Sequence, residues 1–304
     1  MLYFTYTLNF ILMMAMPIAL GVFLARRFKL GWGLWAIGAA TFILSQVVHI
    51  PLNMGLTALF TNKILPPPPE AWRPFFNPMV LGLTAGLCEE TARYLVYRFW
   101  IKDAWTWRAG VVFGAGHGSV EAIILGGLAA LTTLQLFALQ GVDLTTLGLP
   151  PEQLPLAQKQ IADFWSAPWP DALLGAVERF FTIPFHIAMA VVVLQAVKRK
   201  NLLWLVAAIL MHTLANAIVV YALGIVGPYW AEAIVARFSV VSVIILFALK
   251  PAHEEIIAPA VVTLPSTATP PPASPESDLR RKMDDSRYSD EPLFHLSRGG
   301  ESAR

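Results

Sequence analysis

The residues that could do chemistry begin with three charges inside an apolar stretch. Glu89, Glu90 and Arg93 lie within residues 82–100, which have the length and apolarity of a membrane span. A charge at the centre of a bilayer costs about 2.5–3.5 kcal/mol on insertion scales. On a helix either carboxylate lies about one turn from the arginine, which would hold both in place. The pattern indicates a functional site inside the membrane, or else an ion pair that only positions the helix.

Three further apolar segments carry polar residues at a similar depth. They contribute His117 and Glu121, then His186, then the pair His212 and Asn216. At ~1.5 Å per residue, Glu89 and the three histidines each lie about 14–16 Å from the end of their own segment that is expected on the same side of the membrane. That depth is near the middle of a hydrocarbon core of ~30 Å. The shared depth predicts one polar cluster. Alternatively, each of these polar residues, taken alone, would only form a hydrogen bond that holds two helices together.

The residue types suit hydrolysis by an activated water. Glu89 or Glu90 together with His117 would deprotonate a water that attacks a peptide carbonyl. His212 and Asn216 would stabilise the oxyanion that forms. No serine stands in a Gly-x-Ser-x-Gly pattern and no CxxC pair is present, so a serine or thiol mechanism is disfavoured.

The same residues also suit a metal ion. A divalent metal such as zinc would be held by His117, Glu121, His186 and His212 with a position open to water. The HExxH pattern is absent, so such ligands would have to come from separate helices. The metal-free mechanism is the favoured hypothesis and no cofactor is expected, with the metal-dependent mechanism as the alternative.

The composition predicts a membrane protein made of helices. Of 304 residues 56% are hydrophobic and 14% charged, with a mean hydropathy of +0.59, whereas soluble domains carry about 25% charged residues. The net charge of +2 gives no reason to expect a nucleic-acid partner. Open sheets cannot satisfy their backbone in lipid, so the fold class is all-α, a bundle of about seven transmembrane helices. The expected spans are 3–25, 32–60, 78–100, 108–139, 171–197, 202–223 and 229–249.

Several features of these elements can be anticipated. Gly110, Gly114 and Gly118 form a strip of small residues that lets a neighbouring helix approach closely. Residues 141–170 form the longest connection, with a short interfacial helix expected around 152–165. Glu178 and Arg179 lie near the outer end of their span and are expected to be hydrated. Residues 1–250 form the transmembrane domain, and 251–304, rich in Pro, Ser, Thr and mixed charges, are expected to be a disordered cytoplasmic tail.

The positions of basic residues predict the orientation in the cell membrane. Three connections, after the first, third and fifth spans, are the most basic, with Arg26, Arg27 and Lys29, then Arg98, Lys102 and Arg108, then Lys198, Arg199 and Lys200. Basic loops remain in the cytoplasm. The N-terminus is therefore expected outside and the C-terminal tail in the cytoplasm.

Four sequence motifs resemble a known family. The segments CEETARY from Cys88, FGAGHGSVEAI from Phe113, FHIAMAV from Phe185 and HTLAN from His212 are similar to the YhfC-type predicted intramembrane proteases. That type lies near the CAAX-protease and bacteriocin-processing (CPBP) superfamily, whose motifs are EExxxR, FxxxH and HxxxN. The first motif here is one residue shorter, EExxR, as in the YhfC type, and His186 is an additional candidate site residue.

The resemblance covers roughly residues 1–250 and implies a multi-pass peptidase. It implies cleavage of a peptide or membrane-protein substrate within or beside the bilayer by a glutamate-activated water, with a metal mechanism as the alternative. Two other classes stay open on the residues alone: a proton-coupled carrier, because charges at mid-membrane also mark ion pathways, and a non-catalytic scaffold or immunity protein.

Overall fold

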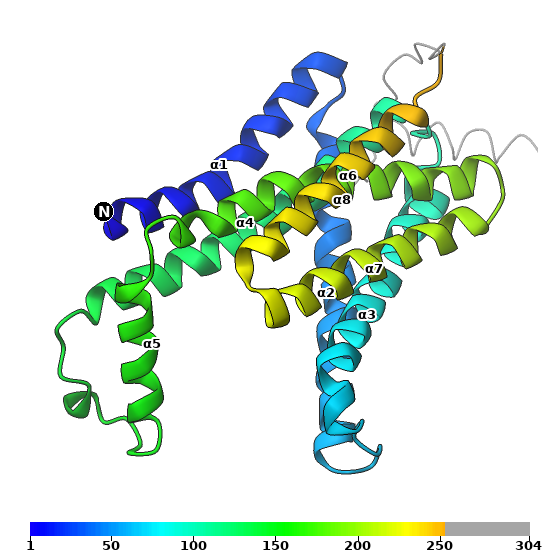
Figure 1. The fold of residues 1–304 in the computed structure, drawn as a ribbon. Helices are drawn as coiled ribbons and strands as arrows, with labels where there is room; N and C mark the ends of the chain where they lie inside the picture. Colours follow the sequence, from blue (N-terminus) through cyan, green and yellow to red (C-terminus); the bar gives the residue numbers. More distant parts are fainter. Residues whose placement is uncertain (253–304) are drawn as a thin grey trace, which may run out of the picture. The chain divides into compact units, whose positions relative to one another are not determined.

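The computed structural model describes residues 1–252 of the chain, and every regular element within that range is helical (Figure 1). The expected tail, apart from its first two residues, lies outside the described residues. The elements are α1 (Leu2–Phe28), α2 (Trp32–Thr61), η1 (Glu70–Trp72), α3 (Arg73–Leu95), the π-helix η2 (Val96–Trp100), α4 (Trp107–Ala138), η3 (Leu144–Leu147), α5 (Leu154–Ser166), η4 (Asp171–Leu173), α6 (Leu174–Lys198), α7 (Leu203–Val226) and α8 (Pro228–Ala248). The all-helical prediction is confirmed.

Six of the expected spans form helices that are long and apolar enough to cross a membrane: α1, α2, α4, α6, α7 and α8, with η4 leading into α6. Each is at least 21 residues long, and a spanning helix needs about 20. The remaining long helix, α3, has 23 residues but is less apolar because it carries Glu89, Glu90 and Arg93. Those three side chains are buried in the bundle.

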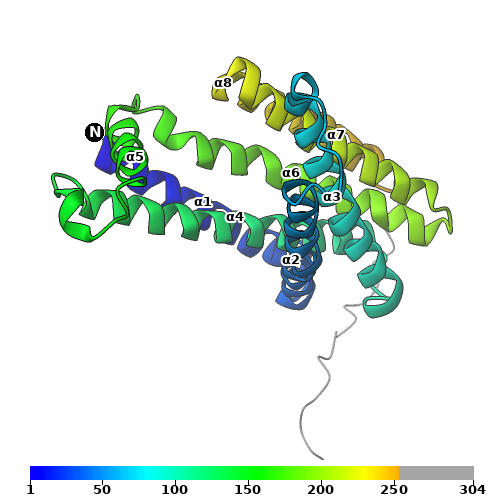
Figure 2. The same cartoon turned by 90° about the horizontal axis from the view of Figure 1, so that it is seen from below.

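The central element is α6. In its most apolar stretch 78% of the residues are buried, against 17–39% in the other five candidate spans. It packs against α4, α7 and α8 and also contacts α1 and α3. Figure 2 shows α6 between α4 on one side and α7 and α8 on the other. A side chain on α6 can therefore meet residues from most of the bundle.

Glycines allow α4 to approach both of its neighbours closely. A Cβ atom at Gly114 would lie 2.8 Å from Ile187 Cα on α6. On the opposite side, a Cβ atom at Gly38 of α2 would lie 2.0 Å from the carbonyl oxygen of Phe113. Real Cβ atoms do not approach other atoms so closely, so both positions require glycine. The close approach predicted for the glycine strip is confirmed at Gly114.

The connection between α4 and α6 contains the helix expected around 152–165, which is α5. Before it, Asp143 caps η3: its carboxylate accepts hydrogen bonds from the Thr145 backbone N–H at 3.0 Å and from the Thr145 hydroxyl at 2.7 Å. These hydrogen bonds hold the pKa of the Asp143 carboxyl below its usual range. The connection is thus locally ordered by its own side chains.

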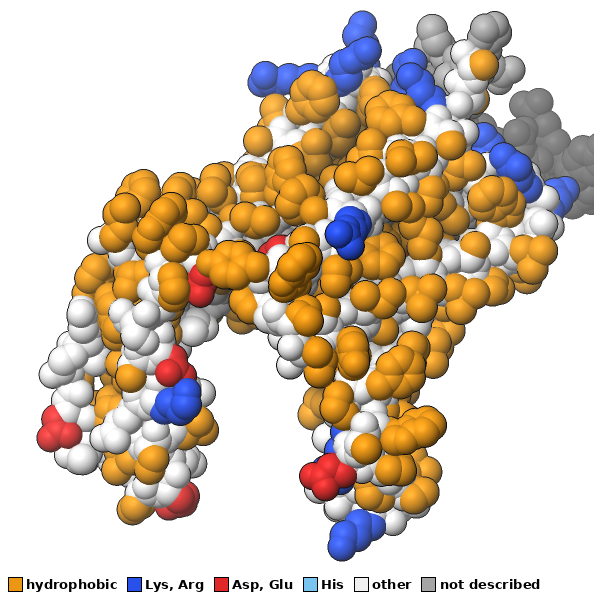
Figure 3. Space-filling view, viewed as in Figure 1, with side chains coloured by type: hydrophobic (Ala, Val, Ile, Leu, Met, Phe, Trp, Pro, Cys, Tyr) orange, Lys and Arg blue, Asp and Glu red, His pale blue; other side chains and the backbone are white. Residues whose placement is uncertain are grey.

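Hydrophobic side chains cover most of the face drawn in Figure 3. Lys and Arg side chains gather where α1 is followed by α2 and where α6 is followed by α7. This distribution is that of a protein whose sides face lipid and whose ends face water.

Candidate active site

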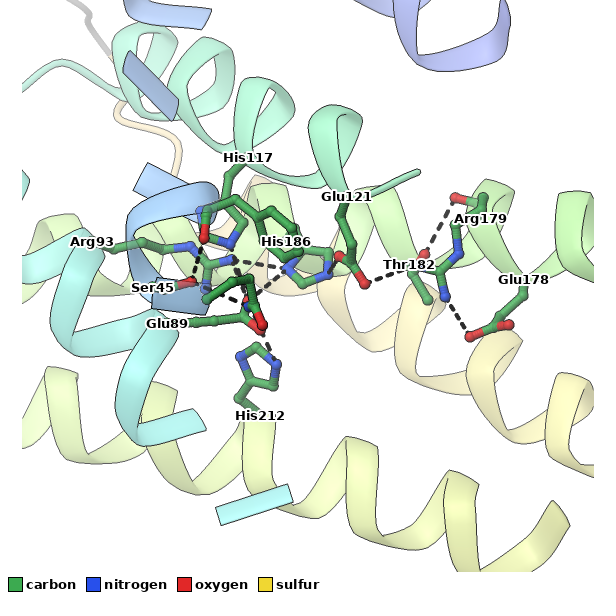
Figure 4. A network of polar contacts seen from close by, with 12 residues as sticks. Ser45, Glu89, Arg93, His117, Glu121, Glu178, Arg179, Thr182, His186 and His212 are labelled. Atoms are coloured by element: carbon green, nitrogen blue, oxygen red, sulfur yellow. Dashed lines mark hydrogen bonds and ion pairs between the residues drawn. The ribbon is translucent and has the colours of Figure 1, made fainter. Parts of the chain in front are cut away.

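Four helices bring the charged and imidazole side chains into one buried cluster (Figure 4). Helix α3 supplies Glu89, Glu90 and Arg93, α4 supplies His117 and Glu121, α6 supplies His186 and α7 supplies His212. Apart from Glu121, which is partly exposed, each of these residues is at most 5% exposed. The convergence expected from their common depth is present in the structure.

Glu89 lies at the centre of the three imidazoles. Its Oε2 atom is 3.0 Å from His117 Nε2, 3.9 Å from His186 Nδ1 and 4.0 Å from His212 Nε2. Ligand atoms of Glu89, His117 and His186 all lie within 4.8 Å of one another. Such a group of one carboxylate and two imidazoles has the donor types that zinc prefers.

Arg93 binds both carboxylates of its helix. Its Nη1 donates a short hydrogen bond to Glu90, and its Nη2 lies 3.5 Å from Glu89 Oε2. The shorter EExxR spacing therefore still lets one guanidinium contact both glutamates. Its Nη2 also lies 2.8 Å from His186 Nδ1.

The contacts of His186 and His212 assign their tautomers. Since Arg93 can only donate, His186 Nδ1 accepts, and the ring proton is on Nε2, which lies 2.6 Å from Glu121 Oε2. His212 Nδ1 lies 2.6 Å from Glu90 Oε1 and carries the proton that binds this carboxylate. The two lone-pair nitrogens, His186 Nδ1 and His212 Nε2, lie 3.9 Å and 4.0 Å from Glu89 Oε2. A carboxylate on the far nitrogen of a histidine is the usual support for a metal ligand.

Glu121 is held in turn by Arg179, a residue of α6. Arg179 Nη1 donates to Glu121 Oε1 at 2.8 Å, and its Nη2 donates to Glu178. Arg179 is 5% exposed and lines the cavity described below, so its hydration stays a prediction. Glu178 is closer to that expectation, with 38% of its side chain exposed. The spacing of seven residues between Arg179 and His186, two turns on one helix face, is the signal that would have linked Arg179 to the site.

A cavity of about 260 Å³ opens beside this cluster. Its polar lining includes Glu89, Glu121, His186, His212 and Asn216, and its apolar walls include Phe181, Phe185, Val219, Val235 and Phe238. Asn216, one turn after His212, reaches this cavity. The cavity gives a peptide carbonyl and a water room next to the acids and imidazoles.

The cluster is short of positive charge. Four carboxylates, Glu89, Glu90, Glu121 and Glu178, face the guanidiniums of Arg93 and Arg179, which leaves a formal charge of −2 with neutral imidazoles. Several buried polar atoms, among them His117 Nδ1 and Glu90 Oε2, have no hydrogen-bond partner within the described structure. Uncompensated charge is costly in an apolar interior. A divalent cation would neutralise it.

The group of ligand atoms shares His117 and His186 with the set anticipated from the sequence, but it contains Glu89 and lacks Glu121 and His212. The metal-dependent alternative placed Glu121 among the ligands with the three histidines. In the structure Glu121 lies on the far side of the His186 ring, at Nε2, and Glu89 lies among the lone-pair nitrogens instead. Helical spacing could pair His117 with Glu121 along α4, but it carries no information on which side of a third helix they lie.

A second polar group lies outside this cavity, between α2 and α3. His49 is 3.1 Å from Gln46 Oε1 and 3.2 Å from Thr84 Oγ1, and Thr84 donates to Asn53 at 3.0 Å. Both ring nitrogens of His49 are thus occupied by neutral groups. These contacts are typical of interhelical hydrogen bonds that hold two helices together.

Residues 12–236 match the sequence family described as YhfC intramembrane metalloprotease, which is about three quarters of the chain. The chain belongs to this family. It is also 34% identical over 235 residues to a membrane protein of Bacillus subtilis (strain 168) named YhfC and described as uncharacterized, and the match covers 75% of this chain and 88% of that protein. No solved structure matches the chain.

Membership of the YhfC family makes this chain a multi-pass membrane protein and an intramembrane protease. The resemblance carried by the four motifs is thereby confirmed. The family's description as metalloproteases supports the metal-dependent alternative over the metal-free mechanism favoured from the sequence. It gives no support to the carrier or scaffold hypotheses.

Proposed function

We propose that this chain is a metal-dependent endopeptidase that hydrolyses a bond of a peptide or membrane-protein substrate within or beside the bilayer. Glu89, His117 and His186 would hold a divalent cation such as zinc. The observation that carries this proposal is the buried group of ligand atoms within 4.8 Å of one another, contributed by three helices. The formal charge of −2 on the cluster supports a doubly charged cation.

Arg93 already brings positive charge to this part of the cluster, since its guanidinium lies against Glu89, Glu90 and His186 Nδ1. A cation held by Glu89, His117 and His186 would therefore have to displace Arg93 from His186 Nδ1. His117 Nδ1 and Glu90 Oε2 remain without partners. A cation bound here supplies Lewis acidity and makes a coordinated water more acidic.

The other residues would orient the reacting groups. Glu90 holds His212 by Nδ1, so His212 Nε2 is positioned to accept a proton from the attacking water and to return it to the leaving amine. Asn216 would donate from its amide to the carbonyl oxygen as negative charge develops there. Glu121, held by Arg179, keeps the proton of His186 on Nε2. Arg93 fixes the two adjacent carboxylates.

Metal analysis of the purified protein tests the proposal together with a comparison of membrane peptides from cells with and without active protein. We expect one zinc per chain in the wild type, with loss of metal and of cleavage products in His117→Ala. Glu152→Gln, in the exposed outer connection, is the control and should behave as wild type. Metal-free wild-type protein whose cleavage products persist in the presence of a chelator would overturn the metal-dependent proposal.

A second candidate is hydrolysis by a water that Glu89 activates without a metal. It is favoured by the hydrogen bond between Arg93 and His186 Nδ1, which occupies a nitrogen that a metal would need. In that case Glu89→Gln abolishes cleavage, whereas chelation leaves cleavage unchanged.

We also propose that the N-terminus lies outside the cell and the C-terminus in the cytoplasm. The support is the basic character of the connections after α1, α3 and α6, which gather Lys and Arg at corresponding helix ends. Reporters fused to the two termini test this orientation.

A further inference from the structure

The outer face of α8 carries a charge far from both ends of the helix. Arg237 is exposed, and it has no hydrogen bond or ion pair within residues 1–252. At ~1.5 Å per residue, it lies roughly 14 Å from the first residue of α8 and roughly 17 Å from the last. The other exposed basic residues of this part of the chain lie at helix ends, in connections or on α5.

Its neighbours in sequence place Arg237 at the level of the active-site cavity. Val235 and Phe238 line that cavity from the inner face of α8. Arg237 points the other way, among exposed apolar side chains of the same helix: Trp230, Val240, Val241, Ile244 and Phe247. Hydrophobic side chains also cover most of the face drawn in Figure 3.

An arginine in this position requires a counter-charge. Charged side chains within spans normally face the bundle interior or a wet cavity and are paired there. A lipid phosphate is distant, because Arg237 is far from both helix ends and its side chain is shorter than either distance. The carboxylates of the other spans are engaged elsewhere: Glu121 and Glu178 with Arg179, and Asp171 with Tyr229.

Glu232, on the same helix, is not the counter-charge of Arg237 either. It lies five residues from Arg237, about 140° round the helix, and its Oε2 atom is buried. A second copy of the chain would present the same spans, in which Glu121, Glu178 and Asp171 are engaged and Glu232 has its Oε2 atom buried within residues 1–252. The carboxylate that pairs with Arg237 must therefore belong to another protein.

We propose that the outer face of α8 binds a transmembrane helix of another protein that carries Asp or Glu at mid-membrane depth. Arg237 would pair with this carboxylate, and the apolar side chains around it would pack against the partner helix. Such a helix would lie directly outside the wall of the catalytic cavity. This inference does not depend on the metal or on the hydrolytic mechanism.

The test uses the full chain in phosphatidylcholine vesicles with synthetic transmembrane peptides of Leu and Ala. The peptides differ only at the central residue, which is Glu, Gln or Lys. Binding is measured by energy transfer from the ten tryptophans of the chain to a dansyl group on the peptide. We expect the Glu peptide to bind about tenfold more tightly than the Gln or Lys peptide.

Variants assign the preference to Arg237. Arg237→Leu, which makes α8 more apolar and so keeps it in the membrane, should abolish the preference, and Arg237→Lys should keep part of it. Val240→Leu, on the same face, should bind as the wild type does. Equal binding of all three peptides, or a preference that survives Arg237→Leu, would refute the proposal. Loss of the preference when phosphatidylglycerol is added would also refute it, because that result assigns the site to a lipid phosphate. Dissociation of a wild-type dimer by Arg237→Leu would refute it as well, because that result assigns the site to a second copy of the chain.

Discussion

At the scale of single residues, the orientation of His186 depends on a chain of contacts that runs from α6 to Glu121 of α4 and back to Arg179 of α6. His186 Nε2 lies 2.6 Å from Glu121, and Glu121 accepts from Arg179 at 2.8 Å. Glu178 lies at the more exposed end of this chain. The ring that would bind the metal is thus fixed by residues up to two helical turns away.

We predict that Arg179→Gln weakens zinc binding by about 10–100-fold, because supporting residues of metal ligands typically contribute that much. Without the guanidinium, Glu121 is free to turn away from His186. Titration against a chromophoric chelator measures the affinity. Glu178→Gln is the matched control and should change the affinity by less than about twofold, since the hydrogen bond from Arg179 to Glu121 remains.

A double-mutant cycle separates this positioning role from a general loss of stability. In a Glu121→Gln background, Arg179→Gln should have little further effect, because residues that act through one contact are not additive. Additive losses of affinity would show that Arg179 acts elsewhere than through Glu121.

Spacing along one helix predicts which residues share a helix face, but it could not predict their partners on other helices. His117 with Glu121, and His212 with Asn216, follow from one-turn spacing. That Glu90 binds His212 while Glu89 lies among three imidazoles depends on the rotation of α3 relative to α7, which the sequence does not contain.

At the scale of helices, the close contact between α4 and α6 keeps His117 and Glu121 next to His186. Gly114 makes this contact possible, since any side chain there would meet the backbone of α6. Gly127, on the same helix, has no atom within 4 Å of a Cβ position. Substitution of Gly127 is therefore the matched control for substitution of Gly114.

We predict that Gly114→Leu lowers the stability of the bundle by about 1–3 kcal/mol, the usual cost of overpacking, and abolishes zinc binding because α4 and α6 must separate. Gly127→Leu should leave both properties near wild type. Thermal unfolding in detergent, followed by tryptophan fluorescence, and zinc stoichiometry are the measurements. Equal effects of the two substitutions would mean that the approach of α4 to α6 does not hold the site.

At the scale of the whole molecule, the apolar segments of the sequence predicted which residues form helices but not which helix is central. The most apolar stretch of α6 has a mean hydropathy of 2.0 and that of α1 has 2.2, although 78% of the residues in the first stretch and 22% of those in the second are buried. Lipid and protein interiors are similarly apolar, so hydropathy does not separate a core helix from a peripheral one. The charges of α3 were informative because burial in protein was the only way to accommodate them.

The proposed orientation makes a prediction for the full chain. An alkaline phosphatase reporter, which is active outside the cytoplasm, should be active when fused near Met1 and inactive when fused after Arg304. A green fluorescent protein fused after Arg304 should be fluorescent, since it matures in the cytoplasm. Active phosphatase at the C-terminus would reverse the assignment and place the connections after α1, α3 and α6 outside.

A cation bound as proposed would neutralise the formal negative charge of the cluster and would therefore also stabilise the fold. A ligand that binds only the folded state stabilises it in proportion to the logarithm of its concentration. In a cell that limits zinc, the carboxylates of α3 and α4 would remain partly uncompensated and the packing around Glu89 would loosen, so the protease would be lost by unfolding and degradation as well as by inactivity. Its abundance would then follow the metal content of the membrane's surroundings, without a dedicated regulator.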